Sequence, residues 1–222
     1  MKWAVAVSLM ALVASVLGQT DKPSPCCVSR QFEAVLVQFG GTYVGGRGQP
    51  IETYSTIYFD HDAKILRVNS IQTGATPDAI TTSYAIDDYK SGKRYLVDSN
   101  NTCYVSPVAT AMPEPCVTSN ATYIGKGVLG YGNDSLTVNT WQYIETSTGL
   151  SARAAVTDDC VPVMQIVIGE ISGASTQLTN IFSNFKPSIA DRSVFTLPAA
   201  DTCKPLPTGS PAVPVGRRSL LF

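Results

Sequence analysis

Alternation of apolar and polar positions dominates the middle of the chain. In the segment 150–157, the side chains of Leu150, Ala152, Ala154 and Val156 fall on one face of an extended backbone. A period of two is typical of a strand with one buried face. Similar β-rich runs predict further strands at 32–39, 53–59, 64–71, 81–87, 94–98, 103–108, 123–129, 136–144 and 161–168. About ten short strands separated by turn signals predict a mainly β protein built as a meandering antiparallel sheet or sandwich.

The first of these runs is apolar on both faces. Phe32 and Leu36 lie on one face of 32–39, whereas Val35 and Val37 lie on the other. Such a strand suits a sheet packed between two layers, and it equally suits a sheet that lines a cavity. The pattern leaves a filled core and a lined pocket open as alternatives.

One segment favours a helix. Leu178, Ile181, Phe182 and Phe185 follow helical spacing until Pro187 stops the run. The pattern predicts a helix within 175–195, with a short helical turn at 188–193, so one or two short helices are expected near the C-terminus. Another pair of strands is the alternative for this segment.

The two ends of the chain differ from its body. Residues 1–18 combine Lys2, an apolar run at 4–17 and the small residue Gly18, which is the layout of a secretory signal peptide. The run is too short for a membrane span. We therefore expect a single β domain over 19–203, followed by a flexible Pro-rich tail over 204–222. Gly216-Arg217-Arg218 is either a dibasic processing site or part of a solvated tail.

The cysteines fit an oxidising compartment. All six lie after the signal segment, and an even number predicts three disulfides among 15 pairings: Cys26, Cys27, Cys103, Cys116, Cys160 and Cys203. Three N-x-S/T sequons predict glycans on Asn100, Asn120 and Asn133. The expected location is secreted and extracellular, with the lysosomal lumen as the alternative.

Charge and motif content exclude several classes of function. Charged residues make up 15% of the chain and the formal net charge is −1, which argues against a nucleic-acid partner. The single histidine, His61, lies between two aspartates in a predicted turn, and no G-x-S-x-G element is present, so we expect no enzyme. The glycines between 40 and 48 suit a flexible connection.

Calcium is the one cofactor for which the sequence offers candidate ligands. Oxygen ligands could come from six aspartates: Asp60, Asp62, Asp87, Asp88, Asp158 and Asp159. No D-x-D-x-D-G loop is present, and solvated turn ends explain these residues equally well. The identity of any metal ligands stays unknown.

Several motifs together resemble the ependymin-related secreted glycoproteins. The resemblance runs from Cys26 to Cys203 and is carried by Phe32-Glu33-Ala34, Tyr58-Phe59-Asp60 with Arg67-Val68, Asn100-Asn101-Thr102-Cys103, Val138-Asn139-Thr140-Trp141, Asp159-Cys160-Val161-Pro162-Val163, and the closing Phe182-Ser183-Asn184, Ile189-Ala190-Asp191, Phe195, Pro198 and Cys203. The chain departs from the family pattern at Arg192, where the family usually has Pro. It keeps one Pro of two at 197–199, adds Cys27 and Cys116, and carries the Pro-rich tail outside the family core.

The resemblance implies a fold similar to bacterial lipoprotein carriers, in which two stacked, curved antiparallel sheets enclose an apolar pocket. It implies dimer formation and raises the expectation of calcium binding. Alignment with the family implies the disulfides Cys26–Cys160 and Cys103–Cys203, which leaves Cys27–Cys116.

These expectations converge on a secreted protein that binds lipid or another hydrophobic ligand. Burial of acyl groups would supply the affinity, at about 0.8 kcal/mol per CH₂. Eight residues are candidates for the pocket, although each also suits an ordinary core: Tyr84, Ile86, Tyr95, Leu96, Trp141, Tyr143, Phe182 and Phe185. The alternative function is an extracellular-matrix, cell-adhesion or secreted signalling protein that acts through its glycosylated surface.

Overall fold

The described part of the chain forms one twelve-stranded sheet. The structure is a computed structural model, and it describes residues 22–73, 80–108, 110–145, 149–171 and 173–207. Its strands are β1 (Gln31–Val44), β2 (Arg47–Asp60), β3 (Ile65–Thr73), β4 (Ile80–Asp88), β5 (Lys93–Val97), β6 (Cys103–Pro107), β7 (Thr122–Leu129), β8 (Leu136–Ile144), β9 (Ser151–Val156), β10 (Pro162–Ile171), β11 (Ala174–Lys186) and β12 (Lys204–Pro205). Three single-turn 3-10 helices accompany them: η1 (Gly132–Asp134), η2 (Arg192–Phe195) and η3 (Ala200–Thr202).

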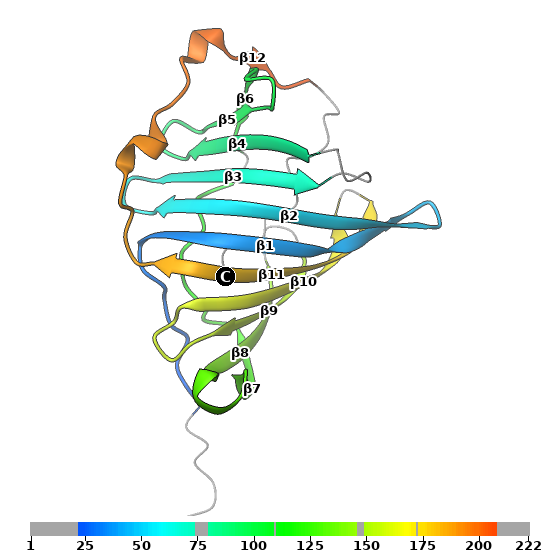
Figure 1. Cartoon of the computed structure of the whole chain (residues 1–222), viewed down its shortest axis with the longest axis vertical. Coiled ribbons are helices and arrows are strands. Elements are labelled where there is room, and N and C mark those ends of the chain that lie inside the picture. Colours follow the sequence, from blue (N-terminus) through cyan, green and yellow to red (C-terminus); the bar gives the residue numbers. More distant parts are fainter. Residues whose placement is uncertain (1–21, 74–79, 109, 146–148, 172, 208–222) are drawn as a thin grey trace, which may run out of the picture.

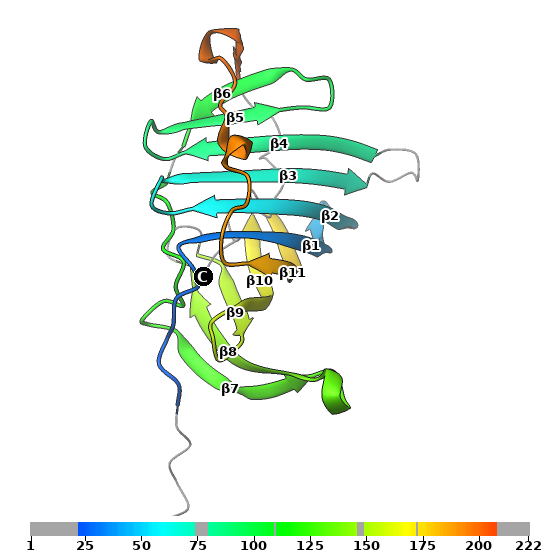
Figure 2. The same cartoon turned by 60° about the vertical axis from the view of Figure 1, so that its left-hand side comes forward.

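Two antiparallel meanders meet at the centre of this sheet. The strand order is β12-β6-β5-β4-β3-β2-β1-β11-β10-β9-β8-β7, so β1 pairs with both β2 and β11. The segment between β6 and β7, which we call the connector, returns from one edge to the other and passes behind the sheet in Figure 1. The sheet twists strongly along its length (Figure 2). We call the side covered by the connector the inner face, and the opposite side the outer face.

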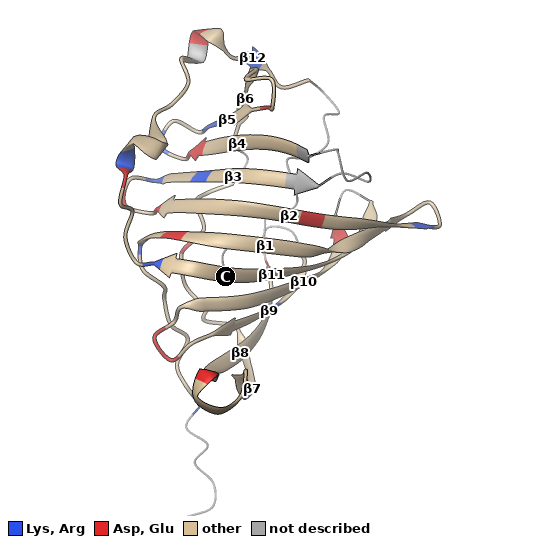
Figure 3. Ribbon diagram, viewed as in Figure 1, with Lys and Arg blue, Asp and Glu red and all other residues tan. Residues whose placement is uncertain are grey.

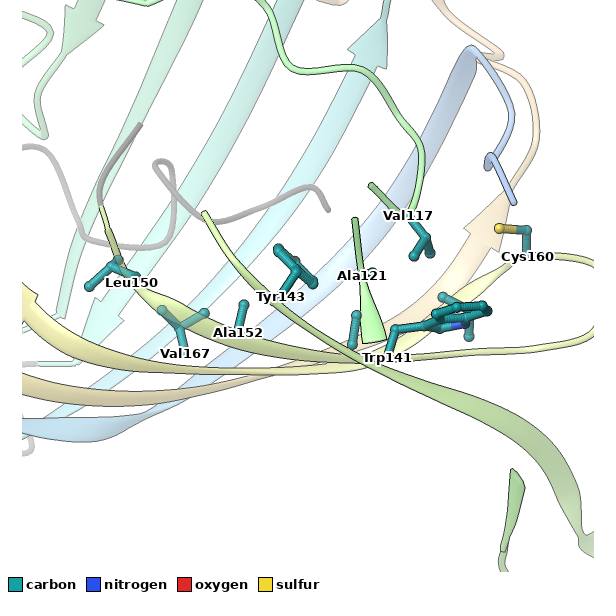
Figure 4. Close-up of a cluster of buried hydrophobic side chains, with 10 residues drawn as sticks. Val117, Ala121, Trp141, Tyr143, Leu150, Ala152, Cys160 and Val167 are labelled. Atoms are coloured by element: carbon teal, nitrogen blue, oxygen red, sulfur yellow. The ribbon is translucent and has the colours of Figure 1, made fainter. Parts of the chain in front are cut away.

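Strict alternation assigns each side chain to a face. In β1, Phe32, Ala34, Leu36 and Gln38 are buried on the inner face, while the residues between them are half-buried or exposed on the outer face. The rings of Phe32 and Phe59 stack at 5.1 Å in one inner-face cluster. A second cluster surrounds Trp141, which points from the strands toward the connector (Figure 4). The hydrophobic core thus lies between the inner face and the segments that cover it.

Three disulfides link the segments outside the strands to one another or to the sheet. Cys27 and Cys116 are bonded where the N-terminal segment and the connector form an antiparallel bridge, flanked by the hydrogen bond from Val28 N to Pro115 O. Cys26 is bonded to Cys160 in the turn after β9, and Cys103 in β6 is bonded to Cys203. This pairing is the one that the family resemblance implies.

The predicted strands and the observed strands agree closely. All ten predicted runs correspond to β1–β10, with ends that differ by a few residues outside the β1–β2 hairpin. The glycine-rich segment is not a flexible connection, because Gly40 and Gly41 extend β1, Gly48 lies in β2, and Gly45 and Gly46 form the two-residue turn with positive φ.

Two expectations about the fold do not match the structure. The expected pair of stacked sheets is not confirmed, since the strands form one continuous hydrogen-bonded sheet in which β1 and β11 join the two meanders. The helix expected within 175–195 is strand β11, whose inner face carries Leu178, Asn180 and Phe182 at a period of two. The apparent helical spacing arises because Ile181 on the outer face is also apolar, and because a bulge at Asn184 (φ 50°) brings Phe185 against Phe32. The one or two short helices expected near the C-terminus are not confirmed: the described C-terminal segment has the single 3-10 turns η2 and η3, and η2 overlaps only the end of the helical turn expected at 188–193.

The ends of the chain are described only in part. The signal segment at 1–18 and the dibasic site at 216–218 lie outside the described residues. The expected free tail does not begin at 204, since Lys204 and Pro205 pair in parallel with Tyr104 and Val105 of β6. No helix in the described ranges is long and apolar enough to cross a membrane.

Candidate ligand site on the outer face

The eight predicted pocket residues do not converge on one cavity. Five of them belong to the inner face: Leu96, Trp141, Tyr143, Phe182 and Phe185. Three belong to the outer face: Tyr84, Ile86 and Tyr95. Ile86 and Tyr95 are buried at the end of the sheet where η2 packs against β3, so only Tyr84 lines an open groove.

The inner face is crossed by a buried chain of hydrogen bonds. Gln38 Nε2 donates to Asn180 Oδ1 at 2.8 Å, and Asn180 Nδ2 donates to Gln165 Oε1 at 2.9 Å. Gln165 Nε2 then donates to the hydroxyl of Tyr143 at 2.9 Å, past the small side chains of β9. Burial raises the pKa of Tyr143 to about 12, despite the opposing effect of the Gln165 hydrogen bond. This chain ties β1 to β8 and satisfies polar groups that face the core.

The outer face carries a continuous apolar row. Register places five side chains directly beside one another on neighbouring strands β3, β2, β1, β11 and β10: Ile71, Tyr54, Val37, Ile181 and Met164. Ile71, Tyr54 and Ile181 are 47%, 42% and 39% exposed. Figure 1 looks onto this face, and no described segment crosses the middle of these strands there. An exposed apolar row of this length is typical of a binding surface.

One groove adjoins the β3 end of the apolar row. This groove, which we call groove 1, has a volume of about 500 Å³ and extends from Tyr54 and Ile71 to the turn after β5. Arg67 lies in its lining with the guanidinium 4.2 Å from the centroid of the Tyr84 ring. Arg67 Nε donates to Asn69 Oδ1 at 2.7 Å, and Nη1 donates to the carbonyl of Val194 at 2.6 Å. The groove therefore combines apolar walls with a fixed cation.

A second groove lies beside the centre of the row, on strands β1, β11 and β10. Groove 2 has a volume of about 640 Å³ and is lined by β1, β10 and β11. Gly41 has no side chain, so a hollow remains between Phe39 and Tyr43, which stand two residues to either side on the same face. Groove 2 shares no residue with the apolar row and lies to one side of it: Phe39 is two residues from Val37 along β1, and Thr179 is two residues from Ile181 along β11.

Five of the six aspartates considered for calcium have structural partners: Asp60, Asp62, Asp87, Asp88 and Asp158. Asp60 and Asp87 are buried, so the interpretation as solvated turn ends is wrong for both: Asp60 accepts from Arg192, and Asp87 binds both Nε and Nη2 of Arg94. Asp158 accepts from Asn139 Nδ2 at 2.7 Å, which together with Lys126 lowers the pKa of its carboxyl. Within the described ranges, no group of three or more His, Cys, Asp or Glu side chains could hold a metal ion.

Charge is sparse along the central strands. Figure 3 shows that most charged residues lie at strand ends and in loops. His61 lies in the β2–β3 turn, where its Nε2 is 3.2 Å from Glu114 Oε1 of the connector. This contact gives His61 a structural role. The sequon residues Asn100, Asn120 and Asn133 are all exposed, in the β5–β6 turn, before β7 and in η1. Glycosylation at these positions stays a prediction.

Sequence reasoning missed Arg67, groove 2 and the apolar row as site features. The two-faced apolar pattern of 32–39 was a signal for the row, because it placed Val37 opposite the core face. The remaining members could not be joined to it, since β11 was expected to be helical and the register between strands is set by contacts distant in sequence.

Comparison with known proteins identifies a family. The sequence model described as Ependymin matches residues 79–203, more than half of the 222-residue chain. No curated protein matches significantly. Among solved structures, an uncharacterized conserved protein from Thermus thermophilus is similar, with 12% identity, a TM-score of 0.47, and coverage of 89% of this chain and 98% of that one. A DUF1329 family protein from Desulfovibrio piger has 11% identity, a TM-score of 0.33, and coverage of 86% and 97%.

Proposed function

The chain belongs to the ependymin family, and from this premise we propose that it is a secreted, non-enzymatic protein that binds a lipid or another hydrophobic ligand on the outer face of its sheet. The three disulfides fit an extracellular protein. The observation that carries the proposal is the apolar row with grooves 1 and 2 beside it.

The dimensions and chemistry of this face suit a small hydrophobic ligand. Both groove volumes fall in the range of roughly 300–1,000 Å³ that is usual for small-molecule sites. The inner face, in contrast, is occupied by core clusters and the hydrogen-bonded chain from Gln38 to Tyr143. Each CH₂ group of a ligand that leaves water against the row would contribute about 0.8 kcal/mol.

The test is binding of a fluorescent acyl probe to the delipidated, secreted protein. We expect Ile181→Glu to weaken probe binding strongly, because it places a charge in the middle of the row. Ile124→Glu is the matched control, since Ile124 is also an exposed isoleucine, 51% against 39% for Ile181, and lies on the edge strand β7. Binding that is absent in the unaltered protein, or that resists Ile181→Glu, contradicts the proposal. A loss with Trp141→Ala and not with Ile181→Glu would move the site to the inner face.

The second candidate is an extracellular-matrix, adhesion or signalling protein. The open form of the outer face favours it, because a flat apolar row also suits a protein partner. Native mass spectrometry of the secreted protein separates the two, since it reports a bound lipid and the stoichiometry, including a homodimer, in one measurement. A protein free of lipid that binds matrix components in an Ile181-dependent way would establish the second candidate.

A further inference from the structure

One predicted glycosylation site lies at the rim of groove 1. Asn100 occupies the exposed turn between β5 and β6, and its neighbours Asp98, Ser99 and Asn101 all line the groove. We propose that groove 1 is a saccharide site filled by the protein's own N-linked glycan, whose first two N-acetylglucosamine residues fold back from Asn100 toward Arg67. This inference goes beyond the proposed function and depends only on glycosylation of this sequon.

The turn that carries Asn100 is fixed by hydrogen bonds from a residue of the groove. Asp98 Oδ1 accepts the backbone N–H groups of Asn100 and Thr102, each at 2.9 Å. The backbone N–H of Asn101 donates to the carbonyl of Asp98 at 3.0 Å, and Asn101 has a positive φ of 58°. Because the side chain that holds the sequon also lines the groove, the attachment point lies directly beside the groove.

The polar lining suits a neutral sugar better than an anion. Arg67 Nε donates to Asn69 Oδ1 and Nη1 donates to the carbonyl of Val194, so both Nη2 donors have no partner among the described residues. Asn69 Nδ2 and Asp98 Oδ2 also have no partner within the described ranges. Free donors together with a free carboxylate oxygen match the hydroxyl and acetamide groups of N-acetylglucosamine, which donate and accept. A bound carboxylate or phosphate would instead meet the like charge of Asp98 in the same groove.

The groove also offers an apolar surface for the C–H face of a sugar ring. Tyr84 of β4 and Val97 of β5 are paired neighbours, and both line the groove. The Arg67 guanidinium lies 4.2 Å from the centroid of the Tyr84 ring, so its free donors are close to this apolar surface. An apolar wall with a few fixed polar groups is the usual composition of a small-molecule site.

The distance from the sequon to Arg67 fits two sugar residues. The sequon turn follows β5, and β4 and β3 are the next strands of the sheet (Figure 1). Two interstrand spacings, about 10 Å, therefore separate β5 from Arg67 on β3. Two linked pyranose rings span a similar length. Tyr54 and Ile71, which belong to the apolar row, form the other end of the groove, so the row and groove 2 stay open to a hydrophobic ligand.

The other two sequons provide controls within the same molecule. Asn120 lies in the connector and Asn133 lies in η1, and neither has a sequence neighbour in the lining of groove 1 or groove 2. Both are exposed, as Asn100 is. Exposure of the asparagine alone would therefore make the three glycans equally accessible, and a difference between them would report on the groove.

The test is the rate at which peptide-N-glycosidase F releases each glycan from the folded, full-length secreted protein. This enzyme binds the first two N-acetylglucosamine residues, so it acts on Asn100 only when they leave the groove. Glycopeptide mass spectrometry follows the three sites separately. We expect release at Asn100 to be about tenfold slower than at Asn120 and Asn133, the effect of one hydrogen bond to a charged group. After denaturation the three rates should converge.

A variant that fills the groove tests where the glycan lies. Thr82 is exposed on β4 in the groove lining, so Thr82→Trp should displace the sugar residues and raise release at Asn100 to the rate of the other sites. Thr81→Trp is the matched control, because Thr81 is exposed on the opposite face of the same strand and lines neither groove. Thermal unfolding first establishes that both variants fold, and the comparison of the three sites in the unaltered protein needs no variant.

Three outcomes would overturn the proposal. The first is equal release at all three sites of the unaltered, folded protein, which would leave groove 1 open for another ligand. The second is slow release at Asn100 that persists in Thr82→Trp, since the turn itself would then hinder the enzyme. The third is a secreted protein without a glycan on Asn100. None of these results depends on binding of the acyl probe, so they are distinct from a failure of the proposed function.

Discussion

Arg192 Nη2 donates a hydrogen bond of 2.5 Å to Oδ2 of Asp60, and the two residues lie 132 positions apart. The Asp60 side chain is fully buried at the end of β2, whereas that of Arg192 is 55% exposed. The other carboxylate oxygen of Asp60 accepts the N–H of Ala63 and so shapes the β2–β3 turn. This contact helps to hold η2 against the sheet.

Removal of Arg192 should destabilise the protein. Arg192→Ala leaves the carboxylate of Asp60 buried without its cation, and we expect the free energy of unfolding to fall by about 2–4 kcal/mol. Urea denaturation measures this change. Lys126→Ala is the control, because its partner Asp158 is exposed and a surface pair contributes about 0–1 kcal/mol. Equal effects of the two substitutions would contradict the importance of the buried carboxylate.

Tyr143 should make the protein sensitive to alkaline pH. Its pKa is raised to about 12 in the folded state, against a usual value of 10.0. Below pH 10 the hydroxyl is protonated in both the folded and the unfolded state, so the free energy of unfolding keeps its full value with respect to this group. Between pH 10 and 12 the unfolded state loses its proton first, and the free energy of unfolding should fall by about 3 kcal/mol in total.

Urea denaturation between pH 9 and 11.5 tests this expectation. Tyr143→Phe should flatten the decline relative to the unaltered protein. Tyr131→Phe, which removes a hydroxyl from a highly exposed ring, should leave the decline as it is. A slope that does not change in Tyr143→Phe would show that the buried hydroxyl is not responsible.

The disulfide between Cys27 and Cys116 should stabilise its surroundings locally. The double substitution Cys27→Ser with Cys116→Ser opens a link across a sequence separation of 89, and we expect a loss of about 2–4 kcal/mol. The sheet itself should persist, because both residues lie outside the named strands. Hydrogen exchange should rise at Val28 and Val117, whose N–H groups bond across the bridge, and stay low in β1. Increased exchange throughout β1 would instead make this disulfide essential to the sheet.

Local pattern was sufficient for most strands and insufficient for the site. The alternation at 150–157 defines β9 because small and apolar residues occupy one face throughout. In β11, apolar residues on both faces imitate helical spacing, and only pairing with β1 and β10 decides between strand and helix. The apolar row could not be predicted for the same reason, because it also depends on pairing between strands. Its five members come from strands that are distant in sequence, and a shift of one residue in any register would move that member to the inner face.

The contacts of Arg67 and Arg192 could not be predicted from the sequence, for a related reason. A lone Arg67 or Asp60 has no periodic signature, and its role depends on which segment packs beside it. Here η2 supplies Val194 to Arg67 and Arg192 to Asp60. A prediction from the sequence alone could mark these side chains as charged positions in a β-rich segment. It could not show that Arg67 lines a groove or that Asp60 is buried.

Gly41 gives the last prediction, which concerns groove 2 beside the apolar row. Gly41→Leu places a side chain in the hollow of groove 2 between Phe39 and Tyr43, where an added Cβ would lie 3.0 Å from Gln49 O and require a small adjustment. If the acyl chain of a ligand bound on the outer face ends in this hollow, a long chain loses more than a short one. We expect hexadecanoic acid to lose about 0.8 kcal/mol of binding free energy for each CH₂ that is displaced, and octanoic acid to bind as before.

Gly127→Leu is the matched control, since Gly127 is a strand glycine on β7 with open space at its Cβ position. Displacement titrations with both acids on both variants measure the effect, after thermal unfolding has shown that each variant folds. An equal loss for the two acids in Gly41→Leu would place the end of the chain elsewhere on the outer face, because only a ligand that reaches groove 2 can sense its closure in proportion to its length.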